Sequence, residues 1–294
     1  MKIAILILAH KNPGQLRLLV NRLKQDFEVY LHFDTASSIS SEITEEEHVH
    51  ILQQRYRTSW GSFNIVLAEL ELLRSALSHN CDYYMLISGQ DLPIKSNKAI
   101  ATFVEQHYAD HIECHPLPLD YWGAQGGLER MTLYWESTAM HDTVINLPVR
   151  AAMKVVRGVQ KILGLKRKVK SKLYGGSQWF NLTRETVKSV LSFIDENPWF
   201  LKQFHHSRAS DELFIQTAVM HVAQTITNSR DSRHYRYFDW KTGPTYPRIL
   251  SMNDYQSFMS SENLFARKFD EKVESTVIHR VMMETNESLP LSPG

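Results

Sequence analysis

Residues 3–14, with the sequence IAILILAHKNPG, decide the fold of this chain of 294 residues. The run from Ile3 to Ala9 is continuously apolar, as expected of a strand that is buried on both faces of a parallel sheet. The turn-forming residues 12–14 end this run, and apolar residues at helical spacing follow over 15–23. The stretch therefore predicts a buried strand that is followed at once by an amphipathic helix.

The same alternation continues through the first hundred residues. Further strands are expected at 29–33 and 83–88, and helices are expected after the tripeptide 60–62 and over 97–107. The polar segment 37–48 reads as a solvated loop or helix start. This order predicts an α/β fold with a mostly parallel central sheet flanked by helices, whose ligands lie at the carboxyl ends of the strands.

The second part of the chain has a different pattern. Residues 116–148 lack a clean period, which suggests a long loop-rich connection beside a site. The remaining expected elements are a short strand at 112–114, a strand at 175–182, and helices at 184–195 and 211–222. The C-terminal part after these reads as irregular, basic and aromatic, and residues 286–294 are expected to form a flexible tail.

The charge balance excludes some partners. With Lys+Arg at 33 and Asp+Glu at 32, the net charge of +1 provides no overall field for nucleic acid, so none is expected as a partner. The two cysteines, Cys81 and Cys114, cannot form a disulfide framework and fit a reducing compartment. No run of 18 apolar residues is present, so the expected location is cytoplasmic.

Residues 150–172 stand out because they contain nine basic residues and no acidic one. Apolar residues at helical spacing within this segment predict a basic amphipathic helix. Such a helix can lie on an anionic membrane surface, which suggests peripheral contact with the inner membrane face. The alternative is a solvated helix that packs on its own domain.

Several catalytic motifs are missing from the sequence. No P-loop, no G-x-G-x-x-G after the first strand and no G-x-S-x-G is present. His107, His111 and His115 have a spacing that one helix face would share, but Pro116 makes an unbroken helix doubtful, and no metal site is expected there. No two aspartates stand at i and i+2, so the charge of a departing nucleotide diphosphate would have to be met by Arg and Lys.

Taken together, seven segments resemble the core-2/I-branching β-1,6-N-acetylglucosaminyltransferases, the family that also contains the peptide O-xylosyltransferases. They keep the family order and are AILILAHKN (4–12), VYLHFDTAS (29–37), SWGSFNIV (59–66), YYMLISGQDLPIKSN (83–97), YGGSQWFNLTRE (174–185), SRASDELF (207–214) and NLFARKFD (263–270). The resemblance implies a GT-A-like fold in one domain over 1–285, with a nucleotide-binding half at 1–110 and an acceptor half at 111–285. It also implies inverting, metal-independent transfer from a UDP-sugar, with no cofactor.

Carried over by position, the resemblance assigns the donor. His10 and Asp34 match the positions that hold uridine, and Asp34 can accept the uracil N–H or, alternatively, cap a turn. Arg55 is expected near the base or ribose. Gln90 and Asp91 follow a strand end, where Asp91 is expected to orient the donor sugar or the surrounding loop.

The later segments complete the donor site. Ser177 and Gln178 are expected to bind the donor sugar, and Trp179 is expected to form a wall or to pack in a bulged strand. Lys268 and Arg248 resemble the basic pair that binds the pyrophosphate. Arg267, which is adjacent to Lys268, is the alternative to Arg248.

The general base implied by the resemblance is Glu212, which would take the proton of the acceptor hydroxyl. Its alternative role is that of an acid in the first turn of a helix, where Asp211 would serve equally well. In RYFDWK (236–241), Tyr237, Asp239 and Trp240 are expected to line the acceptor groove, or else to form a buried strand. Trp60 either packs in the core or touches sugar.

The expected function is transfer of GlcNAc or xylose to a glycan or lipid-linked glycan. The animal relatives have an anchor, a stem and many cysteines. This sequence shows none of these features, so a bacterial-type enzyme is expected. Two alternatives stay open: a non-catalytic nucleotide- or glycan-binding module on the same fold, and a different nucleotide-dependent enzyme on a similar scaffold.

Overall fold

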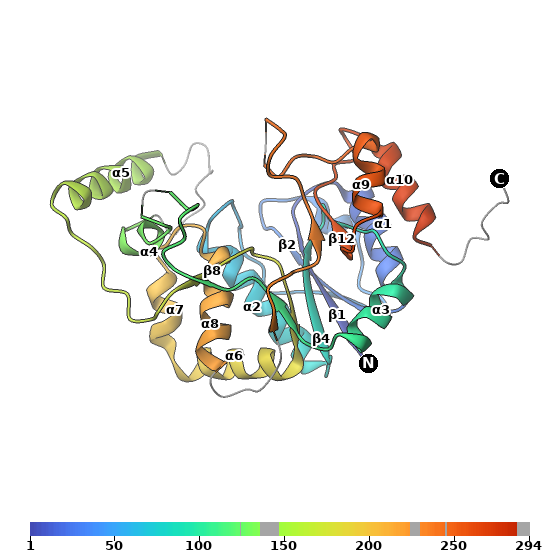
Figure 1. Cartoon of the computed structure of the whole chain (residues 1–294), viewed down its shortest axis with the longest axis horizontal. Helices are drawn as coiled ribbons and strands as arrows, with labels where there is room; N and C mark the ends of the chain where they lie inside the picture. Colours follow the sequence, from blue (N-terminus) through green and yellow to red (C-terminus); the bar gives the residue numbers. More distant parts are fainter. Residues whose placement is uncertain (124, 136–146, 224–229, 245, 287–294) are drawn as a thin grey trace.

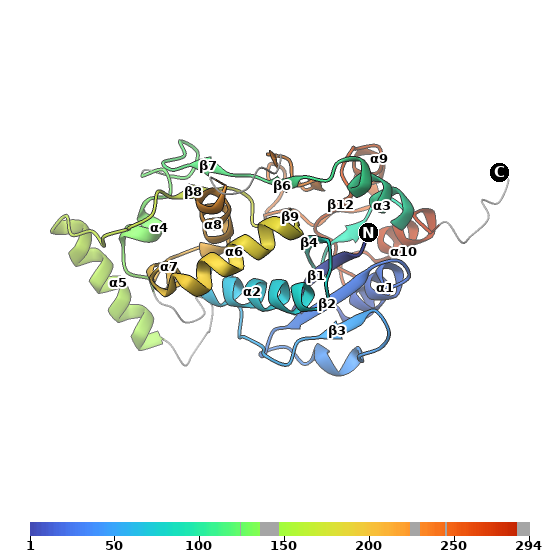
Figure 2. The ribbon, with the colours of Figure 1, turned by 90° about the horizontal axis from the view of Figure 1, so that it is seen from below.

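The structure is a computed structural model, and it describes residues 1–123, 125–135, 147–223, 230–244 and 246–286. Its centre is a seven-stranded sheet with the strand order β10-β6-β9-β4-β1-β2-β3 (Figures 1 and 2). The strands are β1 (Ile3–Ala9), β2 (Glu28–Phe33), β3 (Val49–Ile51), β4 (Tyr83–Ser88), β6 (Asp110–Ile112), β9 (Phe180–Thr183) and β10 (Arg230–Asp231).

The sheet is mostly parallel, as the sequence predicts. β1 pairs in parallel with β2 and with β4, β2 with β3, and β10 with β6. Only β9 runs against its neighbours, since it is antiparallel to both β4 and β6. The sheet thus joins strands from the first hundred residues with β9 and β10 from the second part of the chain, and the expected α/β fold is confirmed.

Alternate residues of β1 face two different cores, because side chains of a strand point to opposite faces of the sheet. Ile3, Ile5 and Ile7 pack in the core under α1 and α3, whereas Ala4 and Leu6 pack in the core under α2, α6, α7 and α8. Burial of both faces explains why this strand is continuously apolar. The helices are α1 (Pro13–Leu23), α2 (Phe63–Ser78), α3 (Asn97–Gln106), α6 (Arg184–Glu196), α7 (Pro198–Phe204) and α8 (Phe214–Val222).

Shorter elements surround this layered core. A three-stranded sheet has the order β11-β12-β5, and β7 pairs with β8. These strands are β5 (Leu92–Pro93), β7 (His115–Pro116), β8 (Tyr174–Gly175), β11 (Arg236–Tyr237) and β12 (Phe265–Ala266). The remaining helices are α4 (Glu129–Thr132), α5 (Leu147–Ile162), α9 (Tyr255–Met259), α10 (Ser275–Glu284) and the 3-10 turns η1 (Ile39–Glu42), η2 (Ser210–Glu212) and η3 (Met252–Asp254).

Three sequence-based expectations about elements are wrong in detail. The strand expected at 175–182 is split into β8 and β9, since a Cβ on Gly176 would lie 2.0 Å from the Glu113 carbonyl oxygen and only glycine allows this approach. The strand expected at 112–114 ends at Ile112. The helix expected at 211–222 begins as the 3-10 turn η2 and becomes α-helical only at Phe214.

The C-terminal part is more regular than expected. It contributes β11, β12, α9 and α10, and Val277, Ile278 and Val281 of α10 pack in a small core with Leu92. Segment 37–48, expected to be solvated, contains η1, and Ile39 and Ile43 are buried. Most of the expected tail, residues 287–294, lies outside the described residues.

The basic segment 150–172 forms a helix over only part of its length. α5 begins at Leu147 and ends at Ile162, and the positive φ of 65° at Gly164 marks the turn that follows. In both views α5 lies at the edge of the molecule, away from the central sheet (Figures 1 and 2). No helix within the described ranges has the length and apolar character needed to cross a membrane.

Candidate active site

The carboxyl ends of β1, β2 and β4 meet at one edge of the sheet. The Asp34 N–H donates to Ala9 O at 2.9 Å, which places Asp34 beside His10. His10 is exposed to solvent. Desolvation by the surrounding protein and the charge of Lys11 lower the pKa of His10, while the carboxylate of Asp34 opposes this. Two of the residues expected to hold uridine are therefore brought together.

Asp34 also fastens a loop to the end of β2. Its Oδ1 accepts the Ala36 N–H at 2.6 Å, and its Oδ2 accepts the Thr58 N–H at 2.8 Å and the Thr58 hydroxyl. His32 Nε2 accepts the Tyr56 N–H at 2.9 Å, so a second bond holds the same loop. These bonds place Arg55 near the carboxyl ends of the strands. They also show that Asp34 stabilises a turn, which is its alternative role.

Gln90 and Asp91 organise the loop after β4. Asp91 is completely buried, and its carboxylate accepts the Ser88 hydroxyl at 2.7 Å and the Ser88 N–H at 3.2 Å. Gln90 Nε2 donates to Phe269 O at 3.1 Å, and the Phe269 N–H donates to Gln90 O at 2.9 Å. Asp91 thus has the loop-orienting role, one of the two that the sequence suggests, and Gln90 ties the segment of Lys268 to this loop.

Positive charge gathers where that segment crosses the sheet edge. The Arg267 guanidinium lies 3.9 Å over the Trp179 ring, and its Nε and Nη1 have no hydrogen-bond partner; Asp91 Oδ1 is 3.7 Å from Nε. Desolvation lowers the pKa of Arg267. Desolvation and the charges of Lys11 and Arg267 also lower the pKa of Lys268. Mutual repulsion among these cations favours binding of an anion.

Arg248 has a different environment from the one expected for a phosphate ligand. Its Nε donates to Asp239 Oδ2 at 2.9 Å and its Nη1 donates to Asp254 Oδ2 at 3.0 Å. The two carboxylates, Asp254 first, raise the pKa of Arg248. Arg248 is hydrogen-bonded to two carboxylates, whereas Arg267 has one carboxylate, Asp91, at 3.7 Å and no hydrogen bond to it, so Arg267 is the better candidate partner for Lys268.

Residues of the YGGSQWF segment point in several directions. The Ser177 N–H donates to Glu113 Oε2 at 3.0 Å, and Gln178 Nε2 donates to Glu69 Oε1 at 2.7 Å. Trp179 is 7% exposed and belongs to the core under α2 and α6, while its ring also carries Arg267. The packing role expected for Trp179 is thus present, and its role as a wall of the donor site stays a prediction.

Glu212 lies at the end of η2, next to this segment. The Gly176 N–H donates to Glu212 O at 3.1 Å, which joins the two loops. The Glu212 side chain is 29% exposed, and its Oε2 lies 2.5 Å from Arg130 Nη1. The structure describes no hydrogen bond to its other oxygen, Oε1, from any of the residues it covers. Glu212 therefore offers a partly exposed carboxylate oxygen.

Two further carboxylates lie near Glu212, and the sequence analysis did not predict that both are buried. Glu69 and Asp211 are buried, and Glu69 Oε2 and Asp211 Oδ1 have no hydrogen-bond partner. Desolvation and the charge of Glu212 raise the pKa of Asp211 to about 7. Desolvation and the charge of Asp211 raise the pKa of Glu69 well above its ordinary value. A sequence signal existed, because Glu69 falls on the apolar stripe of α2 between Val66 and Leu73.

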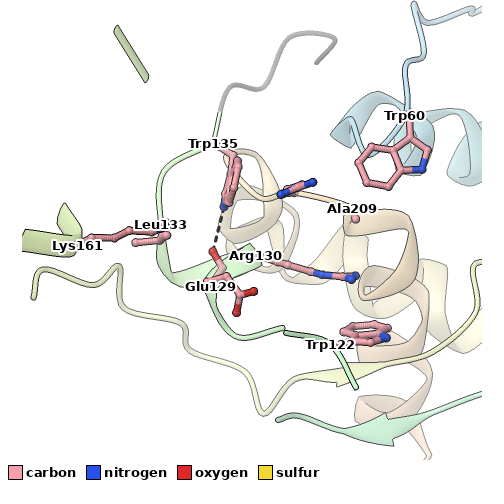
Figure 3. A pocket seen from close by; sticks show the side chains of 9 residues that line it. Trp60, Trp122, Glu129, Arg130, Leu133, Trp135, Lys161 and Ala209 are labelled. Carbon is pink, nitrogen blue, oxygen red and sulfur yellow. Dashed lines mark hydrogen bonds between the residues drawn. The ribbon is translucent and has the colours of Figure 1, made fainter. Parts of the chain in front are cut away.

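A pocket of about 320 Å³ opens beside Arg130 (Figure 3). Its lining, which we call the tryptophan pocket, consists of Trp60, Trp122, Glu129, Arg130, Leu133, Trp135, Lys161, Arg208 and Ala209. The Arg130 guanidinium lies 3.9 Å over the Trp122 ring, and that of Arg208 lies 5.0 Å from the Trp135 ring centre. Trp60 is 57% exposed, so it does not pack in the core.

The three residues expected to line the acceptor groove differ in their contacts and in their exposure to solvent. Asp239 binds Arg248 and Thr242, and Tyr237 packs against Phe258 with ring centres 6.2 Å apart. Trp240 is 52% exposed and stacks on Tyr246 at 6.3 Å with an interplanar angle of 7°. Among these three residues, only Trp240 presents an open ring to solvent.

The histidines with helical spacing do not share a helix. His107 ends α3, His111 lies in β6 and His115 lies in β7. His111 Nε2 is 3.0 Å from His107 O, and His115 Nε2 is 3.2 Å from a Glu113 carboxylate oxygen. In the part of the chain that the structure describes, no three His, Cys, Asp or Glu side chains are grouped so that they could hold a metal ion.

Comparison with known proteins gives distant relatives over most of the chain. Xylosyltransferase 2 of Pan troglodytes is 23% identical over 304 residues, which cover 94% of this chain and 33% of that protein. Xylosyltransferase 1 of Homo sapiens is 20% identical, covering 94% of this chain and 30% of that protein. Beta-glucuronosyltransferase GlcAT14B of Arabidopsis thaliana is 28% identical over 117 residues, covering 37% of this chain and 27% of that protein.

The chain spans about a third of the length of the xylosyltransferases that it matches. A family model also matches most of the chain, because the model described as Core-2/I-Branching enzyme covers residues 3–264. That range contains the carboxyl ends of β1, β2 and β4, the carboxylates of η2 and the tryptophan pocket, and it ends before Arg267 and Lys268. On this match, the chain belongs to the Core-2/I-branching enzyme family, a family of glycosyltransferases.

Proposed function

We propose that this chain transfers a sugar from a UDP-sugar to a hydroxyl of a glycan, with inversion and without a divalent metal, and that Glu212 is the general base. The observation that carries the proposal is the position of Glu212. Its partly exposed carboxylate lies 2.5 Å from Arg130, which lines the tryptophan pocket, so a group bound there can approach it.

The proposed step is a single displacement. The acceptor oxygen attacks the anomeric carbon on the face opposite UDP, the bond from that carbon to the phosphate oxygen breaks, and UDP leaves with the electron pair. Glu212 takes the proton of the acceptor hydroxyl as the oxygen attacks. Because attack and departure occur on opposite faces, the anomeric configuration inverts.

We assign the leaving diphosphate to Arg267 and Lys268. The nitrogens of Arg267 that have no hydrogen bond and the lowered pKa of Lys268 support this, because a nearby anion would relieve the repulsion between the two side chains. Their charges would stabilise the oxyanions of departing UDP, as a metal ion does in other transferases. His10, Asp34 and Arg55 remain the proposed uridine site, and Ser177, Gln178 and Trp179 remain the proposed donor-sugar site.

The environment of the three neighbouring carboxylates supports the choice of Glu212. Burial favours the neutral forms of Glu69 and Asp211, and neither is accessible to an acceptor. Glu212 is the exposed member of the group and is paired with Arg130. Different environments for adjacent carboxylates are a general means of separating their roles.

The donor is proposed to be UDP-GlcNAc or UDP-xylose. The resemblance of the sequence motifs to N-acetylglucosaminyltransferases supports the first sugar, and the relatives that are named xylosyltransferases support the second. A panel of UDP-sugars, assayed for hydrolysis with and without a chelator, tests the donor and the metal requirement together. A non-catalytic binding module, the alternative, would bind UDP without hydrolysing any member of the panel.

We also propose that the enzyme works at an anionic membrane surface, on an acceptor that a lipid carries. Six large apolar side chains on and after α5 are exposed: Val155, Val156, Val159, Ile162, Leu163 and Leu165. Lys154, Lys166 and Lys168 lie among them and are exposed as well. Apolar side chains flanked by cations are the composition of a helix that lies in the membrane interface.

The opposite side of α5 is fixed to the protein. Gln160, which is buried, accepts the Tyr134 N–H at 2.9 Å, and the Arg157 guanidinium lies 4.3 Å from the Trp135 ring centre. Arg167 donates to the carbonyl oxygens of His206 and Gln203 at 2.8 and 2.9 Å. These contacts would hold the apolar face of α5 outward, and they make Arg167 a structural residue rather than a lipid contact.

A further inference from the structure

The tryptophan pocket has the features of a carbohydrate site. Trp60, Trp122 and Trp135 supply three indole rings to one pocket of about 320 Å³. The flat apolar faces of sugar rings pack on such rings, while their hydroxyls need polar partners. Glu129 provides one, because its Oε2 is buried without a hydrogen-bond partner and could accept from a hydroxyl.

The cations of the lining differ in how they are paired. They are Arg130, Lys161 and Arg208, and the lining has one carboxylate, Glu129. Arg130 is compensated by Glu212 at 2.5 Å. Lys161 is exposed, and no carboxylate of the described residues lies within ion-pair distance of it. The lining therefore keeps positive charge on the side that α5 contributes.

Figure 3 shows how these groups are arranged. Lys161 enters from α5 on one side of the pocket, Trp60 and Trp122 lie on the opposite side, and Trp135 and Arg130 lie between them. A sugar ring over the indoles would have one edge toward Lys161 and the other toward the loop of Ala209, three residues before Glu212. The ring and the base would then be neighbours.

We propose that the tryptophan pocket is an acceptor subsite for a sugar that carries an anionic group, such as the carboxylate of a uronic acid or a phosphate ester. The indoles bind the ring, Glu129 accepts from a hydroxyl, and Lys161 binds the anion. This inference rests on the proposed function for one point, namely that the bound sugar is the acceptor. It adds a substrate class, an anionic sugar, that family membership does not provide.

The test compares matched ligands by isothermal titration calorimetry. Methyl β-glucuronide and methyl β-glucoside differ only in the carboxylate, and glucose 6-phosphate supplies the phosphate arm. Saturating UDP is present, so that the anionic ligands cannot occupy the cations near Lys268. At low salt the glucuronide or the phosphate is expected to bind roughly three- to ten-fold more tightly than the glucoside, the scale of one partly exposed charge contact.

Two variants locate the site, and one serves as the control. Lys161→Gln should abolish the preference for the anionic ligand while leaving the glucoside affinity unchanged, and Trp60→Ala should weaken all three ligands. Lys154→Gln removes an exposed cation from the same helix outside the pocket and should behave as the wild type. Far-UV circular dichroism and thermal unfolding confirm that each variant is folded.

The outcomes separate this inference from the proposed function. Equal affinity for glucuronide, phosphate and glucoside, or an anionic preference that survives Lys161→Gln, overturns the anionic subsite. No saturable binding of any of the three ligands overturns the sugar subsite. Wild-type hydrolysis of a UDP-sugar, measured separately, tests the transfer chemistry, so a failure of either proposal is recognisable by itself.

Discussion

The Arg130 guanidinium lies 2.5 Å from the Glu212 carboxylate. The same guanidinium covers the Trp122 ring at 3.9 Å, so one side chain touches both the proposed base and the proposed acceptor pocket. The pairing fixes Glu212 Oε2, and Oε1 receives no hydrogen bond from the described residues. A hydroxyl that binds over the tryptophans would therefore meet a base that is already oriented.

Replacing Glu212 should remove transfer without removing donor binding. Glu212→Gln keeps the shape of the side chain but cannot take a proton, so kcat should fall by at least about 100-fold. UDP affinity, measured by calorimetry, should stay near the wild-type value. Glu105→Gln, which changes an exposed carboxylate on α3, serves as the matched control. Turnover within a few-fold of wild type would assign the base to another residue.

Transfer should survive removal of divalent ions. Arg267 and Lys268 would neutralise the departing diphosphate, so the proposed step does not need a metal. The measurement is initial rate after dialysis against EDTA, with and without added Mn²⁺. A rate that disappears with EDTA and returns with Mn²⁺ contradicts the metal-independent assignment.

The two candidate arginines make opposite predictions for UDP affinity. Lys268→Ala should weaken UDP binding by about 2 kcal/mol, the scale of a charge-assisted contact to phosphate, and Arg267→Gln should have a similar effect. Arg248→Ala should leave UDP affinity unchanged, because Asp239 and Asp254 already compensate Arg248. Lys272→Ala, an exposed neighbour of Lys268, is the control. Loss of affinity in Arg248→Ala alone would restore the assignment suggested by the sequence.

The buried carboxyl of Asp211 should make stability depend on pH. Its pKa is raised to about 7, so the folded state holds the proton more tightly than the unfolded chain. This contribution to stability is complete below pH of about 4 and is lost as pH rises through about 7. Between pH 5 and pH 8, the free energy of unfolding of the wild type should fall by about 2 to 3 kcal/mol because of Asp211. Asp211→Asn should not show this fall.

Urea unfolding at pH 5 and pH 8 measures this difference. Some dependence should remain in the variant, since the pKa of Glu69 is raised in the same direction. Asp120→Asn, at an exposed position, should follow the wild type. Parallel curves for Asp211→Asn and the wild type would mean that Asp211 does not hold a proton in the folded state.

Binding to liposomes should depend on both the cations and the apolar side chains of the α5 surface. Flotation should rise with the fraction of anionic lipid and fall with salt, because each cation contributes up to about 1 kcal/mol near anionic lipid. Replacing Lys154, Lys166 and Lys168 by Glu should abolish binding, and Ile162→Ser with Leu163→Ser should weaken it at constant charge. Arg167 is left intact, because it holds the segment to the protein.

Neutral phosphatidylcholine vesicles and a variant with three exposed lysines changed elsewhere, Lys98, Lys188 and Lys272 to Glu, provide the controls. Equal recovery of the α5 variants and the wild type on anionic vesicles would assign the exposed surface of α5 to another contact.

The local pattern of the sequence was enough for the central layers. The apolar run of β1, the breaker at Asn12–Gly14 and the helical spacing that follows are each set by neighbours in sequence, so β1, β4, α2 and α6 form as expected. The order of these elements implied a parallel sheet with its site at the strand ends. The family motifs then marked Glu212, Lys268 and the strand-end residues as candidates.

Tertiary structure decided which of these candidates are available to a ligand. Asp91 is withdrawn into the loop, Arg248 is compensated by Asp239 and Asp254, and Arg267 is left with two unpartnered nitrogens. Such choices depend on contacts between residues far apart in the chain, and no local pattern encodes them.

The same reason applies to the pocket and to the carboxylates behind the base. Trp60, Trp122, Trp135 and Lys161 come from four separate segments, and Glu69 meets Asp211 only because α2 packs against η2. The sequence determined the elements and the chemical groups that the chain carries. Packing determined which groups are buried, paired or left open, because desolvation and charge compensation depend on all the atoms around a group.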